Sequence, residues 1–216
     1  MAVSLYLSYI SIAFSLLASF TVYSRPQAYS YLKAFPIFLL IIAILGGVIG
    51  YLSLYGKSNI ILYNIFSIFA FCFYFFVLSQ IIVNKKLKKL IFFIMFLYPV
   101  LAFLNTVIIQ KITVFHSRSY SVGCLLIVAF CIYYFYELFQ LPRAINLLKE
   151  TSFWICSGLL FYYACSFPLF GFINSLKNPS DMIITHLGII INLLDVFLYS
   201  SFTIAFLCRI KIRKFI

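Results

Sequence analysis

The residue with the clearest chemical potential is Asp195, which lies near the middle of the apolar stretch Met182–Cys208. An ionisable group at that depth in a helix surrounded by lipid is costly, and it usually faces a bundle interior or a cavity. At about 100° per residue, Asn192, Tyr199 and Thr203 fall on the same helix face as Asp195. This polar face predicts either a ligand, proton or ion site or a hydrogen-bonded aspartate that joins helices, and the sequence leaves both open.

The two histidines do not extend this face. His186 precedes Asp195 by nine residues, or about 900° of helical rotation, so the two side chains are expected on opposite faces. His116 stands in a connection between apolar stretches, and we expect it to be solvated or interfacial rather than a metal ligand or pH sensor.

Glu137 lies near the end of another apolar stretch, close in sequence to Arg143. We expect Glu137 to form an ion pair with Arg143 or with lysines of a neighbouring loop. Such a pair would act either as a latch or as a structural cap.

Pro99 and Pro168 each lie inside an apolar stretch. A proline removes one backbone donor, which frees the carbonyls of Met95 and Ala164 and favours a kink. We expect each kink either to act as the hinge of a switch or to give a cavity a fixed shape.

No set of residues predicts catalysis or a cofactor. No nucleophile with a base, carboxylate pair or metal set converges, so we expect a protein that is not an enzyme and needs no metal. All the cysteines stand inside apolar stretches without a CxxC pair, which is typical of small packing residues: Cys72, Cys124, Cys131, Cys156, Cys165 and Cys208.

The composition shows which environment must hold these residues. Of 216 residues, 65% are hydrophobic and 9% are charged, with a mean hydropathy of +1.13. Soluble domains carry roughly 25% charged residues, so a water-soluble fold is excluded. The net charge of +12 lies at the edges of apolar stretches, where anionic lipid is a nearer partner than nucleic acid.

Seven apolar stretches each approach or exceed the roughly 20 residues that a helix needs to cross a bilayer. Backbone groups must be satisfied internally in lipid, and the stretches lack the alternation of a barrel, so we predict an all-α, polytopic membrane bundle. Residues 1–216 then form a single transmembrane domain. The predicted spans are Val3–Tyr23, Ala34–Tyr55, Ile60–Val83, Leu90–Gln110, Ser119–Phe139, Phe153–Leu176 and Met182–Cys208.

Two small-residue patterns predict close helix packing. The first span carries serines at spacings of three and four residues, namely Ser4, Ser8, Ser11, Ser15 and Ser19, and the second carries Gly46 and Gly50. A packing seam is the favoured interpretation of both, over a polar conduit.

Basic residues set the expected orientation. Twelve lysines and arginines fall in one set of alternate connections and four in the other, which places the carboxyl tail in the cytoplasm and Met1 outside. Two clusters on the inner side predict a surface for anionic head groups or for a cytoplasmic or membrane protein partner. They are Lys85, Lys86, Lys88 and Lys89, and Arg209, Lys211, Arg213 and Lys214.

The stretch from Phe153 to Tyr162 carries the pattern FWxxxGxLxY, and a lysine-rich stretch runs from Asn84 to Lys89. Through these two stretches the chain resembles uncharacterised small seven-helix integral membrane proteins of Bacteroidota. The resemblance extends along the whole chain. The resemblance implies a multi-pass protein of a bacterial inner membrane. It transfers topology and no catalytic residues.

Three functional hypotheses follow. No connection is long enough for a soluble output domain, which favours a receptor-like sensor or a membrane-embedded accessory subunit that acts through cytoplasmic partners. The first alternative is a small-molecule or proton-coupled transporter subunit that uses the Asp195 face. The second alternative is a structural or lipid-organising membrane protein.

Overall fold

The computed structural model describes residues 2–24, 29–56, 58–108, 114–140, 146–171 and 181–208. Seven α-helices and two short 3-10 helices make up the regular structure of these residues, and none of them forms a strand. The elements are α1 (Ala2–Phe20), η1 (Ser30–Ala34), α2 (Phe35–Leu54), α3 (Ile60–Ile81), α4 (Lys85–Ile108), α5 (Ser117–Phe139), η2 (Leu147–Lys149), α6 (Thr151–Gly171) and α7 (Asp181–Leu207). The predicted all-α bundle is confirmed.

Six of these helices, α2 to α7, are long and apolar enough to cross a membrane. In α1 the apolar segment is the shorter Tyr6–Phe20. The 19 residues of α1 nevertheless extend about 28 Å at 1.5 Å per residue, close to the roughly 30 Å of a hydrocarbon core. The chain is therefore a multi-pass membrane protein by the length and composition of its helices.

The helix that was predicted to begin at Leu90 begins five residues earlier, at Lys85. Asn84 is the reason, because its side-chain Oδ1 accepts the backbone N–H groups of Lys86 at 2.9 Å and Leu87 at 3.3 Å. A side chain of this type satisfies the free donors of a first helical turn. The lysine cluster is consequently the first turn of α4 and not a loop.

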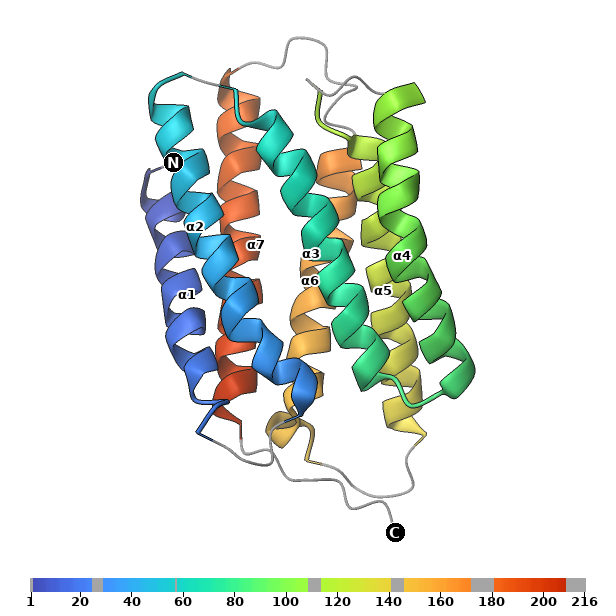
Figure 1. The fold of residues 1–216 in the computed structure, drawn as a ribbon. Coiled ribbons are helices and arrows are strands. Elements are labelled where there is room, and N and C mark those ends of the chain that lie inside the picture. The colour runs from blue at the N-terminus through green and yellow to red at the C-terminus, as the bar shows by residue number, and fades with distance from the viewer. Residues whose placement is uncertain are drawn as a thin grey trace.

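The helices stand side by side in one bundle (Figure 1). The most extensive packing joins α1 to α7, α7 to α6, α6 to α5 and α3 to α4, and α3 also contacts α5. By contrast the backbone of α2 comes close mainly to α1, and α2 contacts α3 chiefly through the rings of Phe35 and Phe38, near the start of α2. The bundle is thus closely packed around most of its circumference, whereas the backbones of α2 and α3 come close together at few positions.

Small residues allow the close approaches, as their spacing predicted. All five serines of α1 are buried, and α1 runs along α7 (Figure 1). On α6, a Cβ added to Gly158 would lie 2.9 Å from the Cβ of Ser201 on α7. Because helices in lipid gain nothing from burying apolar surface, such backbone proximity is a main source of their packing energy.

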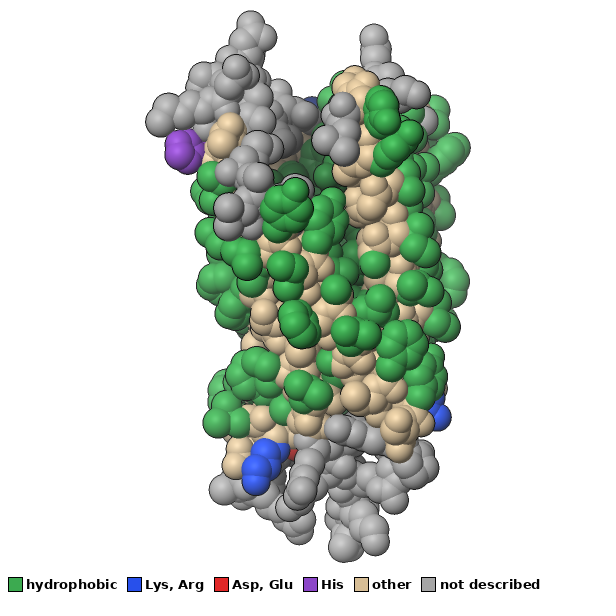
Figure 2. All heavy atoms as spheres, turned by 90° about the vertical axis from the view of Figure 1, so that its left-hand side faces the viewer, with side chains coloured by type: hydrophobic (Ala, Val, Ile, Leu, Met, Phe, Trp, Pro, Cys, Tyr) green, Lys and Arg blue, Asp and Glu red, His purple; other side chains and the backbone are tan. Residues whose placement is uncertain are grey.

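The described basic side chains lie mostly at one end of the bundle. Lys33, Lys149 and the lysines at the start of α4 share the end at which α1 finishes, and we call this the basic end. Arg118 begins α5 at the other end, here called the amino end because α1 starts there. Figure 2 shows an apolar surface between these ends, with lysine or arginine side chains near the bottom. The described charges thus lie at the ends where the connections placed them, and the orientation relative to the cytoplasm stays a prediction.

Candidate functional site

A cavity of about 220 Å³ lies inside the half of the bundle nearer the amino end. Its walls come from α1, α2, α3, α5, α6 and α7, so it occupies the space that the narrow contact between α2 and α3 leaves open. Most of the lining is apolar or aromatic. Six tyrosines contribute, namely Tyr9, Tyr63, Tyr120, Tyr162, Tyr163 and Tyr199.

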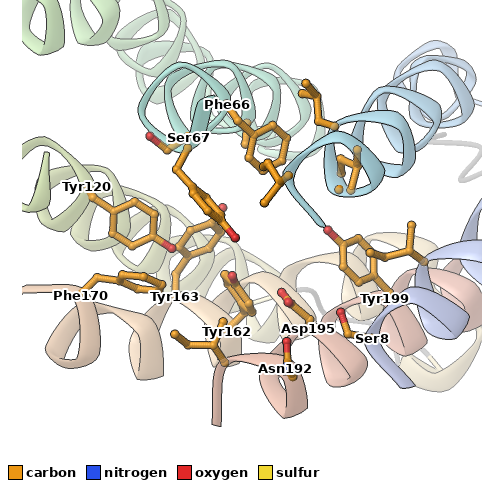
Figure 3. A pocket seen from close by; sticks show the side chains of 18 of the residues that line it. Ser8, Phe66, Ser67, Tyr120, Tyr162, Tyr163, Phe170, Asn192, Asp195 and Tyr199 are labelled. Atoms are coloured by element: carbon orange, nitrogen blue, oxygen red, sulfur yellow. The ribbon is translucent and has the colours of Figure 1, made fainter. Parts of the chain in front are cut away.

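Of the described residues in this lining, Asp195 is the charged one, and its side chain is half-buried. Its carboxylate accepts hydrogen bonds from the hydroxyls of Tyr162 on α6 and Ser8 on α1. Figure 3 shows these three side chains together at one wall of the cavity, with Asn192 beside them. One carboxylate therefore joins three helices, α1, α6 and α7, and also faces a cavity. The predicted ligand, proton or ion site stays a prediction.

Asn192 and the serine face of α1 extend this polar wall. The side-chain amide of Asn192 donates to Ser4 Oγ at 3.2 Å, one helical turn from the contact between Ser8 and Asp195. Ser11 and Ser19 instead donate to carbonyls of their own helix, at 2.7 Å and 2.6 Å. The serine face predicted as a packing seam is thus also a hydrogen-bonding face where it borders the cavity.

Aromatic rings form the opposite side of the cavity. The Phe71 ring lies 5.3 Å from the rings of both Tyr120 and Tyr163, measured between centroids. Gly123 on α5 makes room for Phe71, because a Cβ there would lie 2.7 Å from that ring. Tyr162 and Tyr163 meet edge to face at 5.0 Å. These contacts hold the rings that surround the carboxylate in fixed positions.

The predicted small-residue seam of α2 accommodates a side chain of α1. The Tyr9 hydroxyl donates to the Gly46 carbonyl at 3.1 Å. A Cβ at Gly46 would lie 3.3 Å from the Tyr9 ring, and one at Gly50 would lie 3.0 Å from the Tyr9 hydroxyl. The two glycines thereby position a tyrosine that lines the cavity.

The predicted polar face of α7 is only partly in the cavity. Asn192, Asp195 and Tyr199 line it, whereas Thr203 does not. The Thr203 hydroxyl instead donates to the Tyr199 carbonyl of its own helix at 2.8 Å. His186 is exposed and outside the lining, in agreement with the expected separation from Asp195.

Glu137 caps a neighbouring chain segment at the basic end. Its carboxylate accepts the backbone N–H groups of Val83 at 3.0 Å and Asn84 at 2.9 Å. These bonds tie the turn between α3 and α4 to α5. Arg143, its predicted partner, lies outside the described residues.

Both prolines stand inside continuous helices, Pro99 in α4 and Pro168 in α6. The carbonyl of Met95, which Pro99 deprives of a helical donor, accepts the thiol of Cys72 from α3 at 3.6 Å. Cys72 therefore contributes a hydrogen bond as well as packing. The hinge role of the prolines stays a prediction.

The expected solvation of His116 was wrong, and its interfacial position stays a prediction. Its exposed fraction is 5%, and its backbone N–H donates to Asn64 Oδ1 at 3.0 Å. Its ring Nδ1 lies 3.3 Å from the Thr106 hydroxyl. A connection between helices need not be solvated, because Asn64 on α3 supplies the hydrogen bonds that this segment would otherwise take from water.

Of the two predicted basic clusters, the structure describes the first. Lys85, Lys86 and Lys89 are exposed and Lys88 is half-buried, all in the first turns of α4. The second cluster, Arg209, Lys211, Arg213 and Lys214, lies outside the described residues.

The sequence reasoning missed Tyr162 and Ser8 as partners of Asp195. Tyr162 closes the FWxxxGxLxY pattern, and a tyrosine in mid-membrane needs a partner for its hydroxyl. That requirement was the available signal, although a pairing between α6 and α7 cannot be assigned from spacing within one helix.

The cavity has the chemistry of a binding site. Within the part of the chain that the structure describes, its lining combines one carboxylate, hydroxyls, one amide and aromatic faces, without a lysine or arginine. Within the described residues, no three His, Cys, Asp or Glu side chains are grouped to hold a metal ion. Comparison of the chain with protein-family models, curated proteins and solved structures finds no match.

Proposed function

We propose that this protein is a receptor-like sensor or accessory subunit that binds a small molecule in the Asp195 cavity, within a bacterial inner membrane. The observation that carries the proposal is the position of Asp195, which faces a cavity and is hydrogen-bonded to α1 and α6 at once. A ligand that changes these hydrogen bonds changes the contacts among three helices.

The lining indicates the class of ligand. Aromatic and aliphatic walls favour an apolar body, whereas the carboxylate and the tyrosine faces favour a hydrogen-bond donor with positive charge. The volume of about 220 Å³ is below the roughly 300–1,000 Å³ of pockets for drug-sized molecules. A small apolar amine fits these three requirements.

A signalling role further requires a surface for an output partner. The exposed lysines at the start of α4 lie at the basic end, opposite the cavity, and α3 connects the two regions. In this proposal the bundle detects the ligand in its outer half and reports to a partner at the cytoplasmic surface.

The test is native mass spectrometry of the intact protein purified in nanodiscs. The wild-type protein is expected to carry a small molecule that Asp195→Asn and Tyr162→Phe lose. Thr203→Val is the matched control, because Thr203 shares the helix face but lies outside the cavity. Equal ligand retention by all four proteins would contradict the proposed site.

The alternative is a transporter subunit, which is favoured by the contact of a single carboxylate with three helices. Proton or amine flux into proteoliposomes separates the two functions. If Asp195→Asn abolishes this flux and Thr203→Val preserves it, the protein is a transporter subunit and the sensor proposal is wrong. Binding without flux would support the sensor.

A further inference from the structure

A second cavity, of about 200 Å³, lies at the basic end of the bundle. It is bordered by the end of α3, by α5, and by the segments that precede α2 and α6. The first cavity uses residues 63–71 of α3, and this one uses residues 80 and 81 and the following turn. At 1.5 Å per residue, the nearest lining residues of the two sites, Phe71 and Gln80, are separated by roughly 13 Å along α3.

Two side chains contribute hydrogen-bond acceptors to this second cavity. Glu150 contributes a half-buried carboxylate, and Gln80 contributes a side-chain amide. Among the described residues the lining contains no lysine or arginine, and Lys33 and Lys149 are exposed and outside it. A cation with N–H donors would therefore meet the carboxylate of Glu150 and the side-chain carbonyl of Gln80.

The carboxyl end of α3 adds further negative potential. The last helical hydrogen bond runs from Ile82 to the Leu78 carbonyl at 3.0 Å. The next two N–H groups, of Val83 and Asn84, donate instead to Glu137. Since a helix end carries about half a negative charge on its free carbonyls, residues 80–83 present a cation-attracting end to this cavity.

Tyrosine rings complete the lining. Tyr29 and Tyr31 stack with ring centroids 5.6 Å apart and an interplanar angle of 19°. The Tyr31 hydroxyl is held 3.1 Å from Ser152 Oγ, and Tyr134 is buried on another side. Ring faces attract ammonium groups, and this attraction strengthens where water is excluded.

We infer that this second cavity binds a primary ammonium group. Its place at the basic end is the level of phospholipid head groups, where the ammonium of an aminophospholipid would enter the cavity beside the Lys85–Lys89 cluster. A free small amine offers the same chemistry. In either case Glu150 is the charged partner and Tyr29 and Tyr31 supply ring faces.

Native mass spectrometry and thermal unfolding of the full chain test this inference. The protein is released in the mass spectrometer from nanodiscs of mixed phosphatidylethanolamine and phosphatidylglycerol. After release it is expected to retain phosphatidylethanolamine in preference to phosphatidylglycerol. Glu150→Gln should weaken that retention about tenfold, the effect of losing one charge-assisted hydrogen bond. The matched control is the adjacent Lys149→Gln, which lies outside the cavity and should retain the lipid.

Gln80→Lys tests the site through an expected gain in stability, so its result does not depend on a variant that fails to fold. Its new ammonium should occupy the cavity, exclude phosphatidylethanolamine and raise the unfolding temperature. Protection by free ethanolamine without lipid retention would identify a soluble amine as the ligand and support the site. Equal lipid retention and equal ethanolamine protection in wild type, Glu150→Gln and Gln80→Lys would overturn the inference.

Discussion

Replacing Gly158 by alanine tests the close contact between α6 and α7 that positions Tyr162 beside Asp195. The new Cβ would lie 2.9 Å from the Cβ of Ser201, whereas carbon atoms prefer about 3.5–4.0 Å. The helices must therefore separate by roughly 0.6–1.1 Å at this point, or a side chain must move. Tyr162 stands one helical turn further along α6, so its hydrogen bond to Asp195 should weaken as well.

The expected loss in the free energy of unfolding is about 1–3 kcal/mol, the usual cost of overpacking a close contact. Gly47→Ala is the matched control, because a Cβ at Gly47 meets nothing within 4 Å. That variant should be unchanged or more stable by up to about 1 kcal/mol, since alanine favours helices over glycine.

Unfolding in mixed detergent micelles can be followed by the fluorescence of Trp154, the single tryptophan, which lies in α6. Adding Ser201→Gly to Gly158→Ala removes the clashing Cβ, so the double-mutant cycle should show a coupling of about 1 kcal/mol or more. If Gly158→Ala and Gly47→Ala are equally stable and the cycle shows no coupling, α6 and α7 are not packed as closely as described.

Two further predictions concern the basic end. Glu137→Ala should destabilise the protein by about 1–3 kcal/mol and speed hydrogen exchange at Val83 and Asn84, because both amides lose their acceptor; unchanged exchange at both would show that Glu137 does not hold this turn. Replacing the four lysines of the Lys85–Lys89 cluster by alanine should weaken association with anionic lipid by about 1 kcal/mol per lysine and release a cytoplasmic partner in crosslinking. An unaltered set of crosslinked proteins would count against the output surface.

Apolar length and charge placement were sufficient to predict the architecture. Six helices of this bundle contain an apolar run of bilayer length, and in lipid a run of that kind has few alternatives to a helix. The same local logic placed Asn192, Asp195 and Tyr199 on one face of α7, because helical geometry fixes which residues share a face. The start of α4 was predicted less well. The Asn84 cap extends this helix across lysines that hydropathy alone would leave outside it.

Which helices pack against each other could not be predicted from the sequence and is known only from the tertiary structure. Spacing within α1 predicted a serine face, but only the packing of α1 on α7 brings Ser8 to Asp195. His116 shows the same dependence, because its burial comes from Asn64, 52 residues earlier in the chain. The cavity itself exists because α2 contacts α3 narrowly, a property of helix placement that no single stretch encodes. Periodicity determines what each helix presents, whereas the matching of small residues and rings between helices determines what each face meets.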